Sequence, residues 1–115
     1  MGWTAETLAR KYGISREESD EFSVESHRKA LEARDGGRFT DEIVPYRFSV
    51  KRPGENGAVE ETGVEFSVDE CPRPGTDLEG LPNLRPVFST RGTVTAGNAP
   101  QMTDGAAAVL VIRSQ

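Results

Sequence analysis

The hydrophobic pattern of the first residues predicts a short helix. Thr4 belongs to the residue types that cap helices, and Gly13 belongs to the type that most often ends them. Between these positions, small and apolar side chains recur at helical spacing and share one predicted face. This face consists of Ala5, Leu8, Ala9 and Tyr12.

A second, longer helix is predicted to begin at a capping box. Ser15 and Glu18 have the spacing at which each side chain satisfies a free backbone N–H of the other residue. The helix is expected to continue to about Arg34 and to end at Asp35-Gly36-Gly37. Its predicted apolar face is narrow and consists of Phe22, Ser26, Ala30 and Ala33, with Val24 and Leu31 beside it.

The middle of the chain changes to a period of two. Residues 42–50 alternate and predict a strand, which Pro45 restricts to a sheet edge. Residues 51–63 are polar and rich in glycine, so they predict a mobile excursion. Residues 64–68 alternate strictly and predict a second strand. Residues 72–86 are rich in proline and predict irregular chain.

The C-terminal stretch begins with a β-branched run at residues 92–95. A sharp turn is predicted at Gly97-Asn98, because both residue types tolerate unusual backbone angles. The run from Ala106 to Ile112 lacks polar alternation, so it predicts a strand that is buried on both faces. A tight loop that leads into a buried strand is where open α/β sheets bind ligands.

Composition limits what a chain of this kind can be. Its 115 residues allow one domain at most. A chain of this size buries only about 60–70% of the surface that its unfolded form exposes. Its hydrophobic content of 35% is low, which suggests that some faces pack on other parts of a larger protein. The net charge of −5 gives no electrostatic support to nucleic-acid binding.

Cysteine usage and hydropathy indicate a cytoplasmic protein. A single cysteine excludes an internal disulfide and a metal cluster built from cysteines. No apolar run approaches the length that spans a membrane, and the acidic, helix-forming start does not resemble a signal peptide. We therefore expect neither a membrane nor a nucleic-acid partner.

Cys71 and His27 are the candidates for a chemical role, and the sequence favours neither as a nucleophile, base or metal ligand. Cys71 follows Asp69 and Glu70, whose charges disfavour a thiolate, and Arg73 offsets them only in part. His27 has no second ligand or nucleophile three or four positions away, so a packed or solvated helix histidine is expected. The paired carboxylates are predicted to be solvated faces; they are Glu17-Glu18, Asp20-Glu21 and Glu60-Glu61.

Seven stretches together carry a resemblance to a known family. They are MGWTAE (1–6), YGISREESDEF (12–22), GRFTDEIVP (37–45), DECPRP (69–74), LEGL (78–81), LRPVF (84–88) and GTVTAGNAPQMTDGAAAVLV (92–111). In this order they resemble the thiolase family, the coenzyme A-dependent acyltransferases that make or cleave 3-ketoacyl-CoA. The resemblance covers essentially the whole chain but at most the middle third of a thiolase.

The resemblance implies a partial α/β thiolase-like fold in two parts. Residues 1–91 resemble the helical loop domain with its short strands, and residues 92–115 resemble a loop and the last strand of the N-terminal mixed sheet. The implied reaction is acyl transfer through a cysteine that lies upstream of residue 1. The implied catalytic histidine, second cysteine and asparagine-bearing motif lie downstream of residue 115. The resemblance therefore implies no catalytic residue in this chain, no metal and no organic cofactor.

The resemblance also implies a set of coenzyme A contacts. They are Met1, Arg73, Phe88, Ala96, Ala99 and Pro100. Arg73 matches the arginine beside the CoA nucleotide, and a planar guanidinium suits both adenine stacking and phosphate pairing. Met1 and Phe88 match residues along the pantetheine and acyl path, and Ala96 and Ala99 match small residues beside the pantetheine.

One position departs from the family pattern. Many thiolases have serine where this chain has Pro100, and they direct its hydroxyl toward the pantetheine amide. Proline offers neither a hydroxyl nor an N–H, so this contact is lost or replaced.

Three interpretations stay open at this point. The chain is part of an acyl-CoA C-acyltransferase, whose partners are acyl-CoA, the remainder of the subunit and further copies in a homo-oligomer. Alternatively, it is a non-catalytic CoA-binding or assembly module from a truncated or split thiolase. The third interpretation is a partial gene with no independent product.

Overall fold

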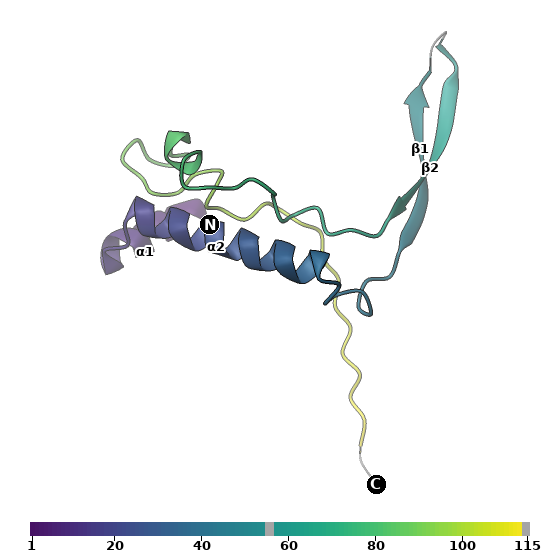
Figure 1. Cartoon of the computed structure of the whole chain (residues 1–115), viewed down its shortest axis with the longest axis horizontal. Helices are drawn as coiled ribbons and strands as arrows, with labels where there is room; N and C mark the ends of the chain where they lie inside the picture. Colours follow the sequence, from purple (N-terminus) through teal and green to yellow (C-terminus); the bar gives the residue numbers. More distant parts are fainter. Residues whose placement is uncertain (55–56, 114–115) are drawn as a thin grey trace.

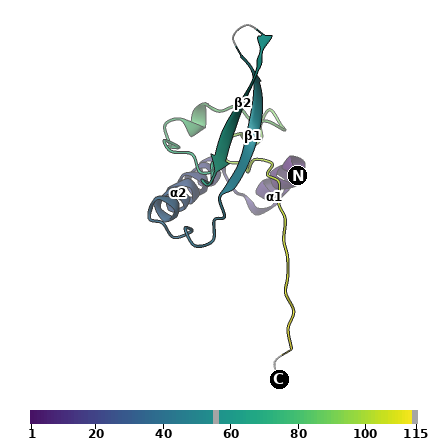
Figure 2. The same ribbon diagram turned by 90° about the vertical axis from the view of Figure 1, so that its right-hand side faces the viewer.

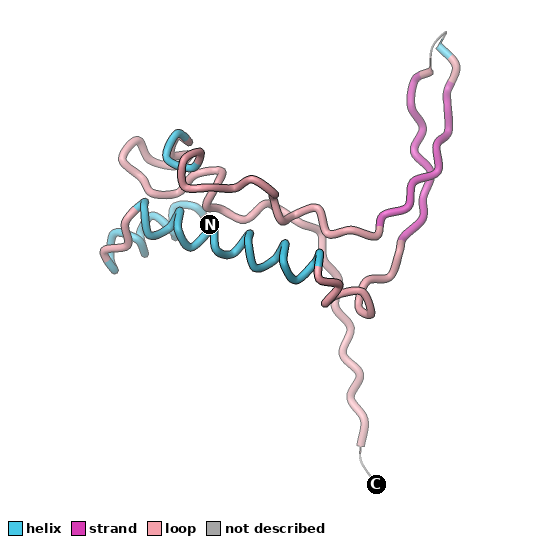
Figure 3. The backbone as a smooth tube through the Cα atoms, in the orientation of Figure 1, coloured by secondary structure: helices cyan, strands magenta, loops and turns pink. Residues whose placement is uncertain are grey.

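The computed structural model describes residues 1–54 and 57–113. Two helices are followed by a β-hairpin, a long irregular segment and an extended C-terminal segment (Figure 1). The elements are α1 (Gly2–Tyr12), α2 (Arg16–Asp35), β1 (Tyr46–Pro53), β2 (Val59–Phe66) and the 3₁₀ turn η2 (Leu81–Asn83). Figure 3 shows how much of the chain between and after these elements is loop. Among the described residues, no helix is long and apolar enough to cross a membrane.

Helix α1 begins earlier than the sequence predicts. Its N-cap is Met1, whose carbonyl accepts hydrogen bonds from the backbone N–H groups of Thr4 (3.0 Å) and Ala5 (3.1 Å). The assignment of Thr4 as the cap is therefore wrong, because glycine at position 2 is tolerated within the first turn. The predicted end is confirmed, since Gly13 adopts the left-handed conformation at φ 68°.

The apolar face that the spacing predicts for α1 is buried only in part. Leu8 and Tyr12 are 46% and 66% exposed. The buried residues are Glu6 and Ala9, of which only Ala9 belongs to the predicted face. The physical reason is that α1 packs on the backbone of a C-terminal loop. The N–H groups of this loop donate hydrogen bonds, which a carboxylate can accept and an apolar side chain cannot.

Helix α2 follows the capping prediction closely. The Ser15 hydroxyl oxygen accepts from the Glu18 backbone N–H at 3.0 Å, and the Glu18 carboxylate accepts from the Ser15 backbone N–H at 2.8 Å. The predicted apolar face is confirmed only at its C-terminal half, where Ala30 and Ala33 are half-buried. Phe22 is 77% exposed, and it lines a cavity that α2 forms with residues 69–72 and 97–101.

The hairpin is longer and more regular than predicted. Strands β1 and β2 pair antiparallel over eight residues each, and they include most of the stretch that the sequence predicts to be a mobile excursion. The correction has an electrostatic reason, because opposite charges face each other across the strands. These pairs are Arg47 with Glu65, Lys51 with Glu61 and Arg52 with Glu60. Pro45 directly precedes β1 and therefore removes no N–H from the ladder.

The hairpin projects away from the helices, as Figures 1 and 2 show from two directions. One of its faces is mainly apolar and is formed by Tyr46, Phe48, Val50, Val64 and Phe66. The rings of Tyr46 and Phe48 stack along β1 with centroids 5.7 Å apart. Phe48 and Phe66 nevertheless stay 40% and 46% exposed, so the hairpin adds little to the core.

The core is small and mostly polar. Only Ala9 and Leu81 are buried apolar residues among those described, and they stand beside buried Glu6, Asp20 and Thr95. The radius of gyration is 19.8 Å, whereas a compact domain of this length has about 13 Å. The chain exposes 10225 Å², whereas a compact protein of its mass exposes about 6200 Å². These values agree with the suggestion from composition that some faces pack on other parts of a larger protein.

The apolar run at residues 106–112 does not form the buried strand that the sequence predicts. It is extended and leads away from the helices (Figures 1 and 2). Val109 and Ile112 are 87% and 80% exposed. The run makes no strand pairing within the described part of the chain, because the only sheet there is the distant hairpin. A strand buried on both faces needs neighbouring strands, and no described residue supplies one.

Candidate functional site

A groove lies between α2, the segment at residues 69–84 and the loop at residues 96–101. It consists of two adjoining cavities of about 440 Å³ and 590 Å³, which share His27, Gly97, Ala99, Pro100 and Gln101. The larger cavity is also lined by Arg73, Ala96, Leu81 and Leu84. Four of the six predicted coenzyme A contacts are thus brought together from segments more than twenty residues apart: Arg73, Ala96, Ala99 and Pro100.

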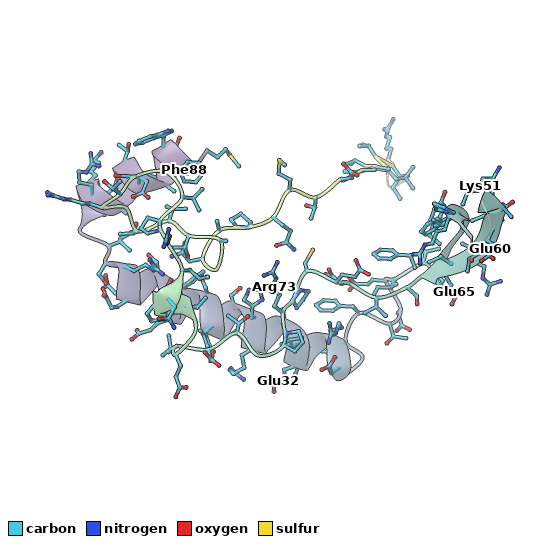
Figure 4. The ribbon with its side chains drawn as sticks, turned by 90° about the horizontal axis from the view of Figure 1, so that it is seen from above. Glu32, Lys51, Glu60, Glu65, Arg73 and Phe88 are labelled. Atoms are coloured by element: carbon cyan, nitrogen blue, oxygen red, sulfur yellow. The ribbon has the colours of Figure 1, made fainter. Side chains whose placement is uncertain are left out.

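The other two predicted contacts lie elsewhere. The Phe88 ring occupies the space beside Gly2 that a side chain there would need, so it packs on the start of α1. The neighbouring Met1 side chain is fully exposed. In Figure 4, Phe88 lies at α1, whereas Arg73 lies farther along the molecule beside α2. The described residues therefore do not unite Met1 and Phe88 with the groove.

Arg73 is held through its backbone and presents its side chain freely. Its backbone N–H donates to His27 Nδ1 at 3.2 Å. Its guanidinium has no hydrogen-bond or ion-pair partner among the residues that the structure describes. A neutral His27 that accepts through Nδ1 carries its proton on Nε2. His27 is half-buried on α2 and lines both cavities.

Cys71 lines the smaller cavity, together with His27 and Asn98. It is half-buried, and its backbone N–H donates to the Asp69 carboxylate at 3.1 Å. An acidic side chain therefore stays next to this thiol, as the sequence indicates. Among the described residues, no basic side chain makes a hydrogen bond with this thiol, which is the contact that activates a cysteine nucleophile.

We call residues 92–98, which border the groove, the groove loop. The side chain of Asn98 fixes its conformation. Its amide nitrogen donates to the Asp20 carboxylate at 2.9 Å and to the Thr93 carbonyl at 2.8 Å. Its amide oxygen accepts from the Thr95 backbone N–H at 2.7 Å. Three hydrogen bonds of one side chain thus close the turn that the sequence predicts at Gly97-Asn98.

Asp20 joins this loop to the 3₁₀ turn through Arg16. The Arg16 Nε donates to Asp20 at 2.7 Å, and its Nη2 donates to the carbonyls of Leu81 (2.6 Å) and Leu84 (3.1 Å). The Asp20 side chain is only 3% exposed and the Arg16 side chain 18%. The prediction that Asp20 lies on a solvated face is therefore wrong, whereas the other predicted carboxylates are exposed. The only sequence signal for the pair is the spacing of four residues between Arg16 and Asp20.

Glu6 holds the other end of the same loop. Its carboxylate oxygens accept from the backbone N–H groups of Thr93 and Val94, both at 3.1 Å. Gly92 lies so close to this carboxylate that a side chain there would displace it. Helices α1 and α2 therefore hold residues 92–98 from two sides, because each supplies one buried carboxylate that accepts hydrogen bonds from this segment.

The large pKa shifts found among the described residues lie away from the groove. Hydrogen bonds from Arg28 and Lys29 lower the pKa of Glu25 to about 2, and the same Glu25 raises the pKa of Arg28. These residues form an exposed ladder with Glu32 on the solvent side of α2 (Figure 4). Because none of them lines either cavity, the shift indicates a surface ion-pair network rather than a catalytic group.

Comparison with known proteins places these features in a family. The family model for the thiolase N-terminal domain matches residues 1–115. The 3-ketoacyl-CoA thiolase of Bacillus subtilis is 51% identical over 97% of this chain and 29% of its own length. The acetyl-CoA acetyltransferase of Pseudomonas aeruginosa is 50% identical over 97% of this chain and 26% of its own length.

Solved structures agree with these relatives. The acetyl-CoA acetyltransferase of Bacillus anthracis superposes with a TM-score of 0.75 at 44% identity, covering 86% of this chain and 23% of that one. The dimeric peroxisomal thiolase of Saccharomyces cerevisiae gives a TM-score of 0.68 at 40% identity, covering 86% and 22%. The chain thus spans between a fifth and a third of the length of these proteins. It belongs to the thiolase family and has a partial α/β thiolase fold.

Proposed function

We propose that this chain supplies the coenzyme A-binding segment of an acyl-CoA C-acyltransferase that makes or cleaves 3-ketoacyl-CoA. The proposal rests on one observation: Arg73 lines the same cavity as Ala96, Ala99 and Pro100. A free guanidinium suits phosphate and adenine, and small residues let a narrow pantetheine arm approach the backbone. The groove therefore offers both kinds of contact that a CoA thioester requires.

In the proposed reaction, the acyl group passes to a cysteine thiolate and then to coenzyme A or to a second acyl-CoA. Backbone N–H donors stabilise the thioester oxyanion, and no metal or organic cofactor is needed. We assign the nucleophile and its proton-transfer partners to another part of the thiolase. The role of this chain is to orient the thioester, with the loop at residues 92–98 held rigid by Glu6 and Asp20.

A non-catalytic CoA-binding or assembly module is the second candidate. The exposed apolar face of the hairpin and the unpaired run at residues 106–112 favour it, because both are surfaces that bind protein. The DNA sequence that flanks the coding region distinguishes the enzyme segment from the non-catalytic module. In-frame motifs for a cysteine nucleophile upstream, and for the histidine and second cysteine downstream, would support the enzyme segment.

The relatives bear on assembly and on cellular location. We propose a homo-oligomer for the intact protein, since one related structure is that of a dimeric thiolase. The cytoplasmic location stays a prediction, because the curated relatives include both bacterial and peroxisomal thiolases.

The proposal predicts that Arg73→Ala weakens coenzyme A binding more than it slows chemistry. A contact remote from the thioester is made equally in the ground and transition states, so KM rises while kcat changes little. Loss of one partly exposed charged contact costs about 1–2 kcal/mol, which corresponds to a roughly 5- to 30-fold rise in KM. The effect is measured by steady-state kinetics of a chimera, in which this chain replaces the corresponding segment of the Bacillus subtilis relative.

Arg85→Ala is the matched control, because Arg85 is exposed but lines neither cavity. It should leave KM unchanged. A fall in kcat at constant KM for Arg73→Ala would contradict the nucleotide role.

The same graft tests the departure at position 100. Pro100→Ser is expected to lower KM for the CoA substrate, because serine restores a hydroxyl and an N–H beside the pantetheine. Proline is exposed at this edge of the groove, so the change needs no repacking. An unchanged KM would mean that the loop satisfies the pantetheine amide by another route.

A further inference from the structure

Three side chains on one face of α2 hold the irregular segment that lines the groove. Arg16, His27 and Arg34 are spaced so that, at about 100° per residue, they lie within about 20° of one another around the helix. Arg16 and Arg34 donate to backbone carbonyls toward the two ends of residues 69–84. His27 contacts the segment between these ends, at Arg73, which Figure 4 shows beside α2.

Residues 72–74 offer a single backbone donor. Pro72 and Pro74 flank Arg73, and proline has no N–H. The proline that follows Arg73 also restricts the backbone of this arginine to extended conformations. The N–H of Arg73, which donates to His27 Nδ1 at 3.2 Å, is therefore the one backbone donor that can tie this stiff tripeptide to α2.

The position of the tripeptide decides where the Arg73 guanidinium can reach. Arg73 is exposed, so burial of its side chain does not set its position. Its carbonyl accepts from the Thr76 hydroxyl at 3.1 Å, which is a bond within the segment itself. Among the described residues, the bond to His27 is thus the hydrogen bond that joins Arg73 to α2. Because His27 lines both cavities, this bond holds the arginine at the groove.

We propose that His27 is a positioning residue for coenzyme A binding, because its Nδ1 holds the backbone of Arg73 at the groove. The inference rests on the proposed function, since it requires Arg73 to contact the CoA nucleotide. His27 acts through Arg73 rather than on the ligand. An arginine whose backbone is held in place loses less conformational freedom on binding, so the affinity for CoA is higher with this bond than without it.

Two variants of similar shape separate the hydrogen-bond acceptor from the size of the side chain. The chimera described above carries the full chain within a complete thiolase, and KM for coenzyme A is measured in acetoacetyl-CoA cleavage. His27→Leu removes the acceptor and should raise KM about 3- to 10-fold at unchanged kcat. His27→Asn places an amide oxygen where Nδ1 stood, so its KM should stay within about 2-fold of the unsubstituted chimera.

A loss of helix stability predicts the opposite order. Leucine favours a helix more strongly than asparagine does, so damage to α2 alone would harm His27→Asn more than His27→Leu. Lys29→Leu is the control for an apolar substitution on this helix, because Lys29 is exposed and lines neither cavity. It should leave KM unchanged. A rise in KM for Lys29→Leu equal to that for His27→Leu would overturn the inference.

Coupling to Arg73 separates positioning from direct contact with the ligand. In the Arg73→Ala background, His27→Leu should raise KM little further, because the side chain that His27 positions is absent. Additive effects of the two substitutions would overturn the inference, and so would equal rises in KM for His27→Asn and His27→Leu.

The single variants distinguish failure of this inference from failure of the proposed function. An unchanged KM in His27→Leu beside a raised KM in Arg73→Ala would overturn the role of His27 and leave the proposed function standing. An unchanged KM in Arg73→Ala would overturn the proposed function, and the inference with it.

Discussion

Asp20→Ala is expected to abolish the folded arrangement of the helices and the groove loop. Removal of the carboxylate leaves the largely buried Arg16 guanidinium and one donor of Asn98 without their partner. Breaking a buried ion pair by removing one member costs about 3–5 kcal/mol. A chain with two buried apolar residues among those described has little stability to lose. Urea titration followed by far-UV circular dichroism measures the loss.

Glu21→Ala is the matched control for this substitution. Glu21 is the adjacent carboxylate on α2, but it is exposed, and it makes no side-chain hydrogen bond within the described residues. It should shift the unfolding midpoint by little. Asp20→Asn keeps an acceptor for Asn98 and should fall between the two. Equal midpoints for Asp20→Ala and Glu21→Ala would show that the buried network does not hold the loop.

The isolated chain is expected to show no thiolase activity above background. Cys71 is its only thiol; it lies in the groove close to Asp69, and the thiol makes no hydrogen bond with a described residue. Removal of a complete catalytic set leaves only the small rate enhancement due to binding, which is a loss of roughly a million-fold. Acetoacetyl-CoA cleavage by the purified chain, followed through loss of the substrate's absorbance, measures this rate.

The Cys71→Ser variant is the control for this measurement, and it should give the same background rate. The Bacillus subtilis relative, assayed in parallel, shows that the assay detects turnover. Activity of the chain that disappears in Cys71→Ser would identify Cys71 as a nucleophile. It would also overturn the assignment of the nucleophile to another part of the thiolase.

Local signals in the sequence determined the helices well. The reciprocal bonds of Ser15 and Glu18 and the left-handed Gly13 depend on neighbours within a few residues, so their positions could be predicted without a tertiary structure. The hairpin was predicted only in part. Its alternation was clear at residues 64–66, but the charged residues of its distal half stabilise strands only after they face each other.

The candidate site was predicted through the family resemblance rather than through spacing. Four of its residues share one groove, but Met1 and Phe88 lie at α1. Periodicity assigns polar residues to solvent, and it therefore missed Glu6 and Asp20. Their partners, the N–H groups of the loop and the amide of Asn98, lie more than seventy residues away in the sequence.

The sequence by itself determined the family, helix α2 with its capping box, the end of α1 at Gly13, and the turn at Gly97-Asn98. Only the tertiary structure decided which carboxylates are buried, how far the hairpin extends and that residues 106–112 pair with no described strand. The reason is physical. Caps and turns are satisfied by neighbouring backbone groups, whereas burial of a charge or pairing of a strand depends on partners that folding brings from distant parts of the chain, or that the chain does not contain.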